Sequence, residues 1–148
     1  MNKKISVEDF SRQKKVLDMA GISSGTNVII GYPTETAEDI DLTFEACLRN
    51  GIMPRVCSLL PIPGSEMYDF ALEKGYIEDE KKYIFNIGEQ QYLKINMSQL
   101  SDDRLQAHTI HHLKRIRDHL GLDIADYNLI CSVNIERKTT GRKTLFKD

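Results

Sequence analysis

The sequence has few of the residues that mark specialised classes of protein. Its three cysteines, Cys47, Cys57 and Cys131, are an odd number at long spacings, so a disulfide framework is not indicated. Twenty Lys and Arg against 22 Asp and Glu leave a net charge of −2, which gives no global electrostatic reason to bind nucleic acid or an anionic membrane. No apolar run approaches the roughly 18 residues of a membrane-spanning helix, and no signal-peptide core follows the N-terminus. We expect a cytoplasmic protein with no membrane and no nucleic acid among its partners.

What the sequence does contain is an alternation of strands and capped helices through residues 1–75. Strands are expected over 27–30 and 55–60, and the first has no polar alternation, which predicts burial on both faces. Helices are expected after Ser6, Thr36 and Ser65, each ending near a glycine. Two parallel strands are far short of the eight that close a β/α barrel, so this segment predicts part of a larger sheet.

The second half has a different pattern. A strand is expected over 92–96 and a long helix from Ser101 to Gly121, whereas residues 137–148 are basic and predict a solvated tail. The predicted fold class is therefore α/β. A partial barrel fragment at 1–75 is followed by a mostly helical extension at 76–136 and the flexible tail at 137–148. With two parallel strands leaving apolar surface uncovered, we expect the isolated chain to be only marginally stable.

Two loops follow the predicted strands, at the end of a parallel sheet where ligands gather. In the first, Gly31 would allow close backbone approach to a ligand, Pro33 would stiffen the turn and Glu35 would accept hydrogen bonds. In the second, Leu60 and Pro61 begin a rigid Leu-Pro-Ile-Pro-Gly-Ser bend. Each loop also has a purely structural interpretation, in which glycine and proline only shape the connection and Glu35 only favours the helix dipole.

Taken as an ordered pair, the two loops resemble a known family. The segment Asn-Val-Ile-Ile-Gly-Tyr-Pro-Thr-Glu-Thr-Ala-Glu-Asp-Ile at 27–40 resembles the fifth-strand signature of radical SAM enzymes. Leu-Pro-Ile-Pro-Gly-Ser-Glu-Met-Tyr at 60–68 resembles the sixth-strand loop of the same superfamily. Later segments at 71–77, 95–98 and 100–103 are most similar to the branch in which a cobalamin-binding domain precedes the barrel. The resemblance covers roughly residues 5–120.

The resemblance implies a role for each loop in binding S-adenosylmethionine. Ile29 would pack against the adenine, Gly31 would permit close approach and Glu35 would stand at the strand end, with Pro33 in the same motif. Backbone around Leu60 and Pro61 would contact the adenine or ribose. The intact enzyme would also hold a 4Fe–4S cluster and, in this branch, cobalamin, and it would act on a small-molecule substrate.

One part of the family pattern is missing from this sequence. The CxxxCxxC motif that ligates the cluster is absent, and no pair of the three cysteines has ligand spacing. We therefore expect a C-terminal part of a radical SAM enzyme that has no catalytic or metal-binding residues of its own, is inactive alone and needs the remainder of the barrel as its partner. The alternative is a non-catalytic half-barrel that binds another chain through an exposed sheet edge. A phosphate-binding enzyme is disfavoured, since neither GxGxxG nor a P-loop lysine is present.

The histidines form a separate group. His108, His111 and His112 lie in the predicted helix at 101–121, and His108 and His112 have the i, i+4 spacing that can bind zinc on one helix face. No HExxH pattern is completed, so we interpret them as surface or half-buried histidines that need no partner beyond water. The nearby Lys114, Arg115 and Arg117 indicate either an anion patch or, more simply, a solvated polar face.

Overall fold

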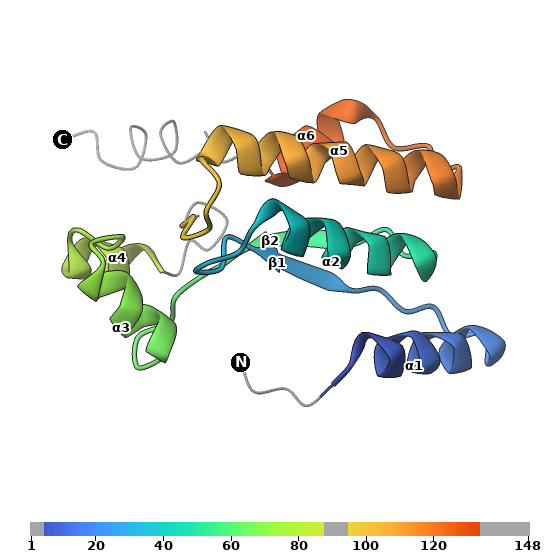
Figure 1. Cartoon of the computed structure of the whole chain (residues 1–148), viewed down its shortest axis with the longest axis horizontal. Helices are drawn as coiled ribbons and strands as arrows, with labels where there is room; N and C mark the ends of the chain where they lie inside the picture. The colour runs from blue at the N-terminus through green and yellow to red at the C-terminus, as the bar shows by residue number, and fades with distance from the viewer. Residues whose placement is uncertain (1–4, 88–94, 134–148) are drawn as a thin grey trace.

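The computed structural model describes residues 5–87 and 95–133. Over these residues the chain is an α/β protein, mostly helical, with six helices and one two-stranded parallel sheet (Figure 1). Every helix in this part of the chain is too short or too polar to cross a membrane. The elements are α1 (Val7–Met19), β1 (Asn27–Ile30), α2 (Ala37–Arg49), β2 (Arg55–Ser58), α3 (Glu66–Glu73), α4 (Glu80–Asn86), α5 (Asp102–Leu120) and α6 (Asp126–Val133).

Side-chain caps set the helix boundaries, as the sequence predicts. The Thr36 hydroxyl accepts a hydrogen bond from the backbone N–H of Asp39, whose carboxylate accepts from the Thr36 N–H in return. The same capping box begins α1. Ser101 caps α5, and Gly121 ends it in the left-handed conformation at φ 62°. These local signals satisfy backbone groups that the helix itself leaves unpaired.

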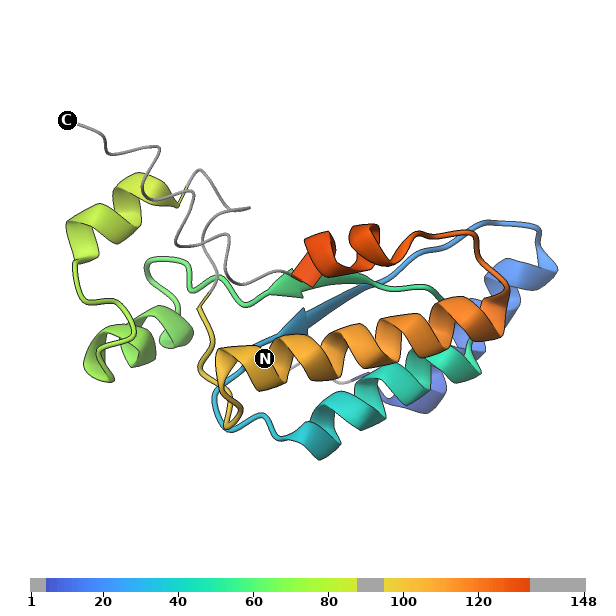
Figure 2. The same cartoon turned by 90° about the horizontal axis from the view of Figure 1, so that it is seen from above.

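The core lies between the sheet and the helices on one of its faces. Strands β1 and β2 pair in parallel with Val28 opposite Val56, and α2 is the connection between them. Helix α5 lies beside α2 and runs in the same direction (Figures 1 and 2). The main buried cluster contains Val28, Ile30, Ile40, Phe44, Cys47, Val56, Leu100, Leu105, Leu113, Ile116 and Leu129. The first and second halves of the chain thus share a core, while the division into 1–75, 76–136 and 137–148 stays a prediction.

Among the described residues nothing covers the opposite face of the sheet, so the predicted burial of β1 on both faces is wrong. Val28 and Ile30 are buried, but Asn27 is exposed and the Ile29 side chain is 41% exposed. Its partner across the sheet, Cys57, is only half-buried. The physical reason is that α2 and α5 both pack on the same side of the sheet, and no element in residues 5–87 and 95–133 packs on the other side.

Helix α1 is attached loosely to this core. Its apolar residues include Phe10, Val16 and Leu17, and none of its residues is buried. A hydrogen bond of 3.0 Å from the Asn50 amide to the Ser11 hydroxyl links α1 to the end of α2. The apolar face of α1 is formed but has little to pack against among the described residues.

Other segments depart from the predicted boundaries. Strand β2 ends at Ser58 rather than Leu60, although the Leu59 N–H still donates to Ile30 O at 2.9 Å. Of the strand expected over 92–96, only Ile95 and Asn96 lie within the described residues, and they are not in a strand. Cys131 lies in α6, within the segment 76–136 expected to be mostly helical, and this helix contributes Leu129 to the core. Residues 137–148 are outside the described part.

A second, smaller core surrounds α3 and α4, which lie beyond the carboxyl ends of the strands (Figure 2). Its buried members are Leu59, Tyr68, Ala71, Ile77, Tyr83 and Met97. Residues from both halves of the chain therefore enclose this end of the sheet as well.

The core assignment predicts different responses from two isoleucines in helices. Ile116 in α5 is 1% exposed, whereas Ile84 in α4 is 45% exposed. We expect Ile116→Val to lower the free energy of unfolding by about 0.5–1.5 kcal/mol, since it removes a buried methyl group. Ile84→Val makes the same chemical change in a helix and should cost less than about 0.5 kcal/mol. Urea unfolding of both variants measures the difference, and equal losses would contradict this core.

Candidate functional site

The two loops predicted to bind a ligand do lie at one end of the sheet. Because β1 and β2 are adjacent and parallel, the loops beginning at Gly31 and at Leu59 leave the same edge. Ile29 reaches the open face of the sheet just before the first loop. The structure thus brings Ile29, the Gly31–Glu35 turn and the Leu60–Pro61 bend to neighbouring strand ends; their contact with a ligand stays a prediction.

The first loop contains a strained turn. The Glu35 N–H donates to Tyr32 O at 3.1 Å, which closes a turn with Pro33 second and Thr34 third. Thr34 has φ 67°, a conformation that β-branched residues rarely adopt and that glycine or asparagine usually supplies. Such strain persists only where surrounding structure maintains it, and it is concentrated at binding sites.

The Glu35 side chain folds back and hydrogen-bonds to the backbone at the start of its own loop. Its Oε2 atom accepts a hydrogen bond of 2.8 Å from the Gly31 N–H. Burial raises the pKa of the Glu35 carboxyl above its ordinary value, and this outweighs the backbone hydrogen bonds from Gly31 and Tyr32, which lower the pKa. The carboxylate predicted to accept hydrogen bonds from a ligand is used here to shape the strand end.

Gly31 allows a close approach, and in this structure the approaching group is the chain's own backbone. Gly31 has φ +90°, and a Cβ at this position would stand 2.9 Å from Ile95 O. The Met97 N–H donates to Gly31 O at 3.0 Å, and the Gln99 N–H donates to Glu35 O at 2.9 Å. Residues 95–99 therefore pack along one side of the first loop.

The second loop is rigid and partly enclosed. Pro61 is buried, and its carbonyl accepts a hydrogen bond of 2.6 Å from the Tyr83 hydroxyl of α4. Burial raises the pKa of Tyr83 to about 12, so the hydroxyl keeps its proton and remains a donor. Leu60 is half-buried beside it.

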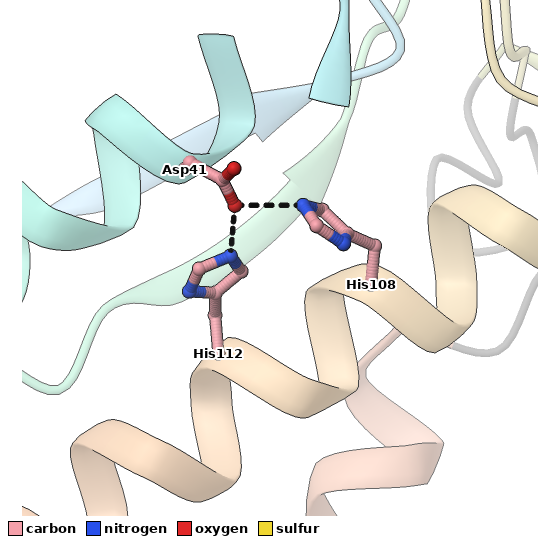
Figure 3. Close-up of side chains that lie close together, drawn as sticks. All are labelled: Asp41, His108 and His112. Atoms are coloured by element: carbon pink, nitrogen blue, oxygen red, sulfur yellow. Dashed lines mark hydrogen bonds and ion pairs between the residues drawn. The ribbon is translucent and has the colours of Figure 1, made fainter. Parts of the chain in front are cut away.

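A third group of side chains was not predicted to come together. Figure 3 shows Asp41 of α2 facing His108 and His112 of α5. Asp41 Oδ1 lies 2.8 Å from His108 Nε2 and 2.7 Å from His112 Nε2. The expectation that these histidines need no partner beyond water is therefore wrong, because α2 packs along the same face of α5 and brings a carboxylate to them.

The surroundings hold this group in place. The His112 ring is buried and stacks on Phe44, with ring centroids 5.1 Å apart and an interplanar angle of 6°. Burial lowers the pKa of His112, while the hydrogen bond from His112 lowers the pKa of Asp41. Arg115 pairs with Glu45 one turn further along both helices. The three groups could hold a metal ion, since their ligand atoms lie within 4.8 Å of one another.

The sequence pattern singled out two of the three residues in this group. The i, i+4 spacing of His108 and His112 was a visible signal, but their acidic partner is 67 residues away from His108 in the sequence and depends on how the helices pack. The nearby cations pair with acids: Lys114 with Asp126, and Arg117 with both Asp118 and Asp126. An anion patch is accordingly disfavoured. Cys47 is buried, and burial raises the pKa of its thiol to about 11.

No family model, no curated protein and no solved structure matches the chain. Its function is therefore inferred from the residues and the geometry described above.

A side chain at Gly31 would be unfavourable for two reasons, the positive φ and the steric contact with neighbouring atoms. Comparison with Gly64, which shares only the positive φ, separates the two effects. Gly64 has φ +84° and nothing within 4 Å of an added Cβ, whereas at Gly31 the Cβ meets Ile95 O. We expect Gly64→Ala to destabilise the chain by about 1 kcal/mol through backbone strain alone. Gly31→Ala should cost clearly more in urea unfolding. Equal costs would mean that residues 95–99 do not pack against the loop.

The raised pKa of Glu35 makes a prediction about pH. A carboxyl with a higher pKa in the folded state holds its proton more tightly there, so stability falls as pH rises from the ordinary value of 4.5 through the folded pKa. Glu35→Gln keeps the acceptor for the Gly31 N–H but does not titrate. The unfolding free energy of the native chain minus that of Glu35→Gln should decrease with pH across this window, and a difference that increases would contradict the assignment.

Proposed function

We propose that this chain is the C-terminal part of a radical SAM enzyme. It would supply the last β/α units of a partial barrel and one side of the adenosylmethionine and substrate site in a cytoplasmic enzyme. The observation that carries the proposal is the parallel sheet with one face covered by helices and the other face open.

An open face is unusual for strands of this kind. Parallel sheets are normally covered on both faces, and in a β/α barrel helices cover the outside while side chains from the other strands fill the inside. Here Val28 and Ile30 face the helices, and Ile29 faces the uncovered side. Ile29 would then point into the barrel, where the resemblance places the adenine.

The edge of the sheet also favours a missing neighbour. Among the described residues β1 pairs only with β2, so its other edge is available to a further strand. Helix α1 also exposes Val16 and Met19, and Ile22 shortly after its end is exposed as well. A preceding β/α unit would cover both features, because a barrel helix packs over neighbouring strands.

The residues of this chain suit the binding of adenosylmethionine but not the binding of the iron–sulfur cluster. The open face at Ile29, the glycine at position 31 and the rigid bend at Leu60 and Pro61 suit a bound nucleoside, with Pro33 and Glu35 holding the first loop in shape. The cysteines do not suit a cluster, since Cys47 is buried in α2 and Cys57 is in β2. The 4Fe–4S cluster, when bound to the remainder of the enzyme, would supply the electron for adenosylmethionine cleavage, and this chain would position the nucleoside and exclude water.

The alternative function is a non-catalytic half-barrel completed by another chain. The free edge of β1 favours it equally, because edge pairing needs only unpaired backbone groups. The two functions differ in the partner, since only the enzyme requires one that carries cluster ligands.

The decisive experiment is to sequence the DNA upstream of Met1 and to co-express the adjacent reading frame with this chain. We expect a CxxxCxxC motif, a stable complex, and reductive cleavage of adenosylmethionine to 5′-deoxyadenosine that needs both parts. Adjacent DNA that encodes nothing related would overturn the enzyme proposal. Gly31 is not a suitable position for the test, since any side chain there collides with Ile95. Ile29→Asp, on the open face, should instead abolish cleavage without affecting this packing.

A further inference from the structure

We propose that Asp41, His108 and His112 form a binding site for a divalent transition-metal ion, with Zn²⁺ as the test ion, that ties α5 to α2. The site is independent of the proposed function, because it is built from helices on the covered side of the sheet. Two imidazole nitrogens and one carboxylate oxygen are a ligand set that zinc and ferrous iron both use in proteins.

The distances are close to those that a metal needs. Asp41 Oδ1 lies 2.8 and 2.7 Å from the two Nε2 atoms, and all three ligand atoms fall within 4.8 Å of one another. Ligands about 2.0–2.1 Å from a tetrahedral zinc stand roughly 3.3 Å apart. The carboxylate would have to retreat by about half an ångström, and the Asp41 side chain, 46% exposed, is free to do so.

Exposure is graded across the site, which leaves one side open to solvent. The His112 side chain is 6% exposed, that of His108 is 29% exposed and that of Asp41, at 46%, is the most accessible. Water can therefore complete the coordination from the Asp41 side. Three protein ligands with one open position are the arrangement of reactive rather than purely structural zinc sites.

The scaffold holds two ligands before any ion arrives. His108 and His112 are one turn apart on the same helix, and stacking against Phe44 fixes the His112 ring. Core residues of α2 and α5 pack beside them, so the distance between the two helices is set by Phe44, Leu105 and Leu113 rather than by the polar group. Because these two ligands are already ordered, less conformational entropy is lost when the ion binds.

The competing explanation is a hydrogen-bonded clamp in which both histidines donate Nε2–H to Asp41. A metal ion requires the opposite tautomer, with a lone pair at Nε2 and the proton at Nδ1. The two explanations therefore differ in the state of the ring nitrogens as well as in metal content.

The test uses the full chain, freed of metal with a chelator that is then removed, and kept reduced with a phosphine, because thiols bind Zn²⁺ themselves. Calorimetric titration should show one Zn²⁺ bound per chain, with a thermal midpoint that rises with Zn²⁺ concentration. In ¹⁵N spectra of the imidazoles, Nε2 of His108 and His112 should shift on Zn²⁺ addition. His119, which is exposed at the end of the same helix, should not shift.

Variants locate the ion. Asp41→Asn and His108→Gln change partly exposed side chains and should fold, so they carry the test even where His112→Gln does not. Loss of a residue that only hydrogen-bonds to a metal ligand typically weakens metal binding by roughly 10–100-fold. Because Asp41 and His108 would be ligands themselves, each variant should weaken Zn²⁺ binding by more than this. His119→Gln and Cys57→Ser are the controls and should bind as the native chain does. Undiminished binding in Asp41→Asn and His108→Gln, or loss of binding in Cys57→Ser, would overturn the proposal by placing the ion elsewhere. No binding by the native chain would overturn it in favour of the clamp.

Discussion

The packing of α5 along α2 is the contact on which the rest of the structure depends. It joins residues from both halves of the chain in one core, with Phe44 from α2 beside Leu105, Leu113 and Ile116 from α5. Without α5, the helical face of this two-stranded sheet would keep only α2 and Leu129 of α6 as cover. The same contact brings Asp41 to His108 and His112, so the polar group is a product of the apolar packing around it.

The strand ends are shaped by the chain's own polar groups. Glu35 accepts from the Gly31 N–H, residues 95–99 pair with the same loop, and the Tyr83 hydroxyl donates to Pro61 O. These bonds satisfy backbone groups at an edge where sheet pairing has ended. They also hold Thr34 at a positive φ that its side chain disfavours. The loops are consequently ordered before any ligand is considered, while the face beside them at Ile29 remains open.

Local signals in the sequence predicted local structure well. Capping at Thr36 and Ser101 and the glycine stop at Gly121 were confirmed, because caps act through bonds between residues at most a few positions apart. Burial was harder to predict. The apolar run at 27–30 predicts a strand buried on both faces, yet Ile29 is exposed. The hydrophobic pattern shows which side chains a strand could bury, but it does not show whether another element covers them. The partners of His108 and His112 were missed for the same reason: sequence spacing shows which residues share a helix face, but not which residue of another helix that face meets.

The order in which the core residues occur along the chain has a consequence for biosynthesis. Both strands and α2 are complete by Ser58, but much of the apolar surface that covers them comes from Leu105, Leu113 and Ile116. A nascent chain on the ribosome cannot close this core until α5 has emerged, many residues after β2. During that interval the sheet residues and α2 remain uncovered, and such exposed apolar surface is prone to aggregate. Closure of this core is therefore expected to wait for α5, whose arrival is the step that commits the sheet to its native packing.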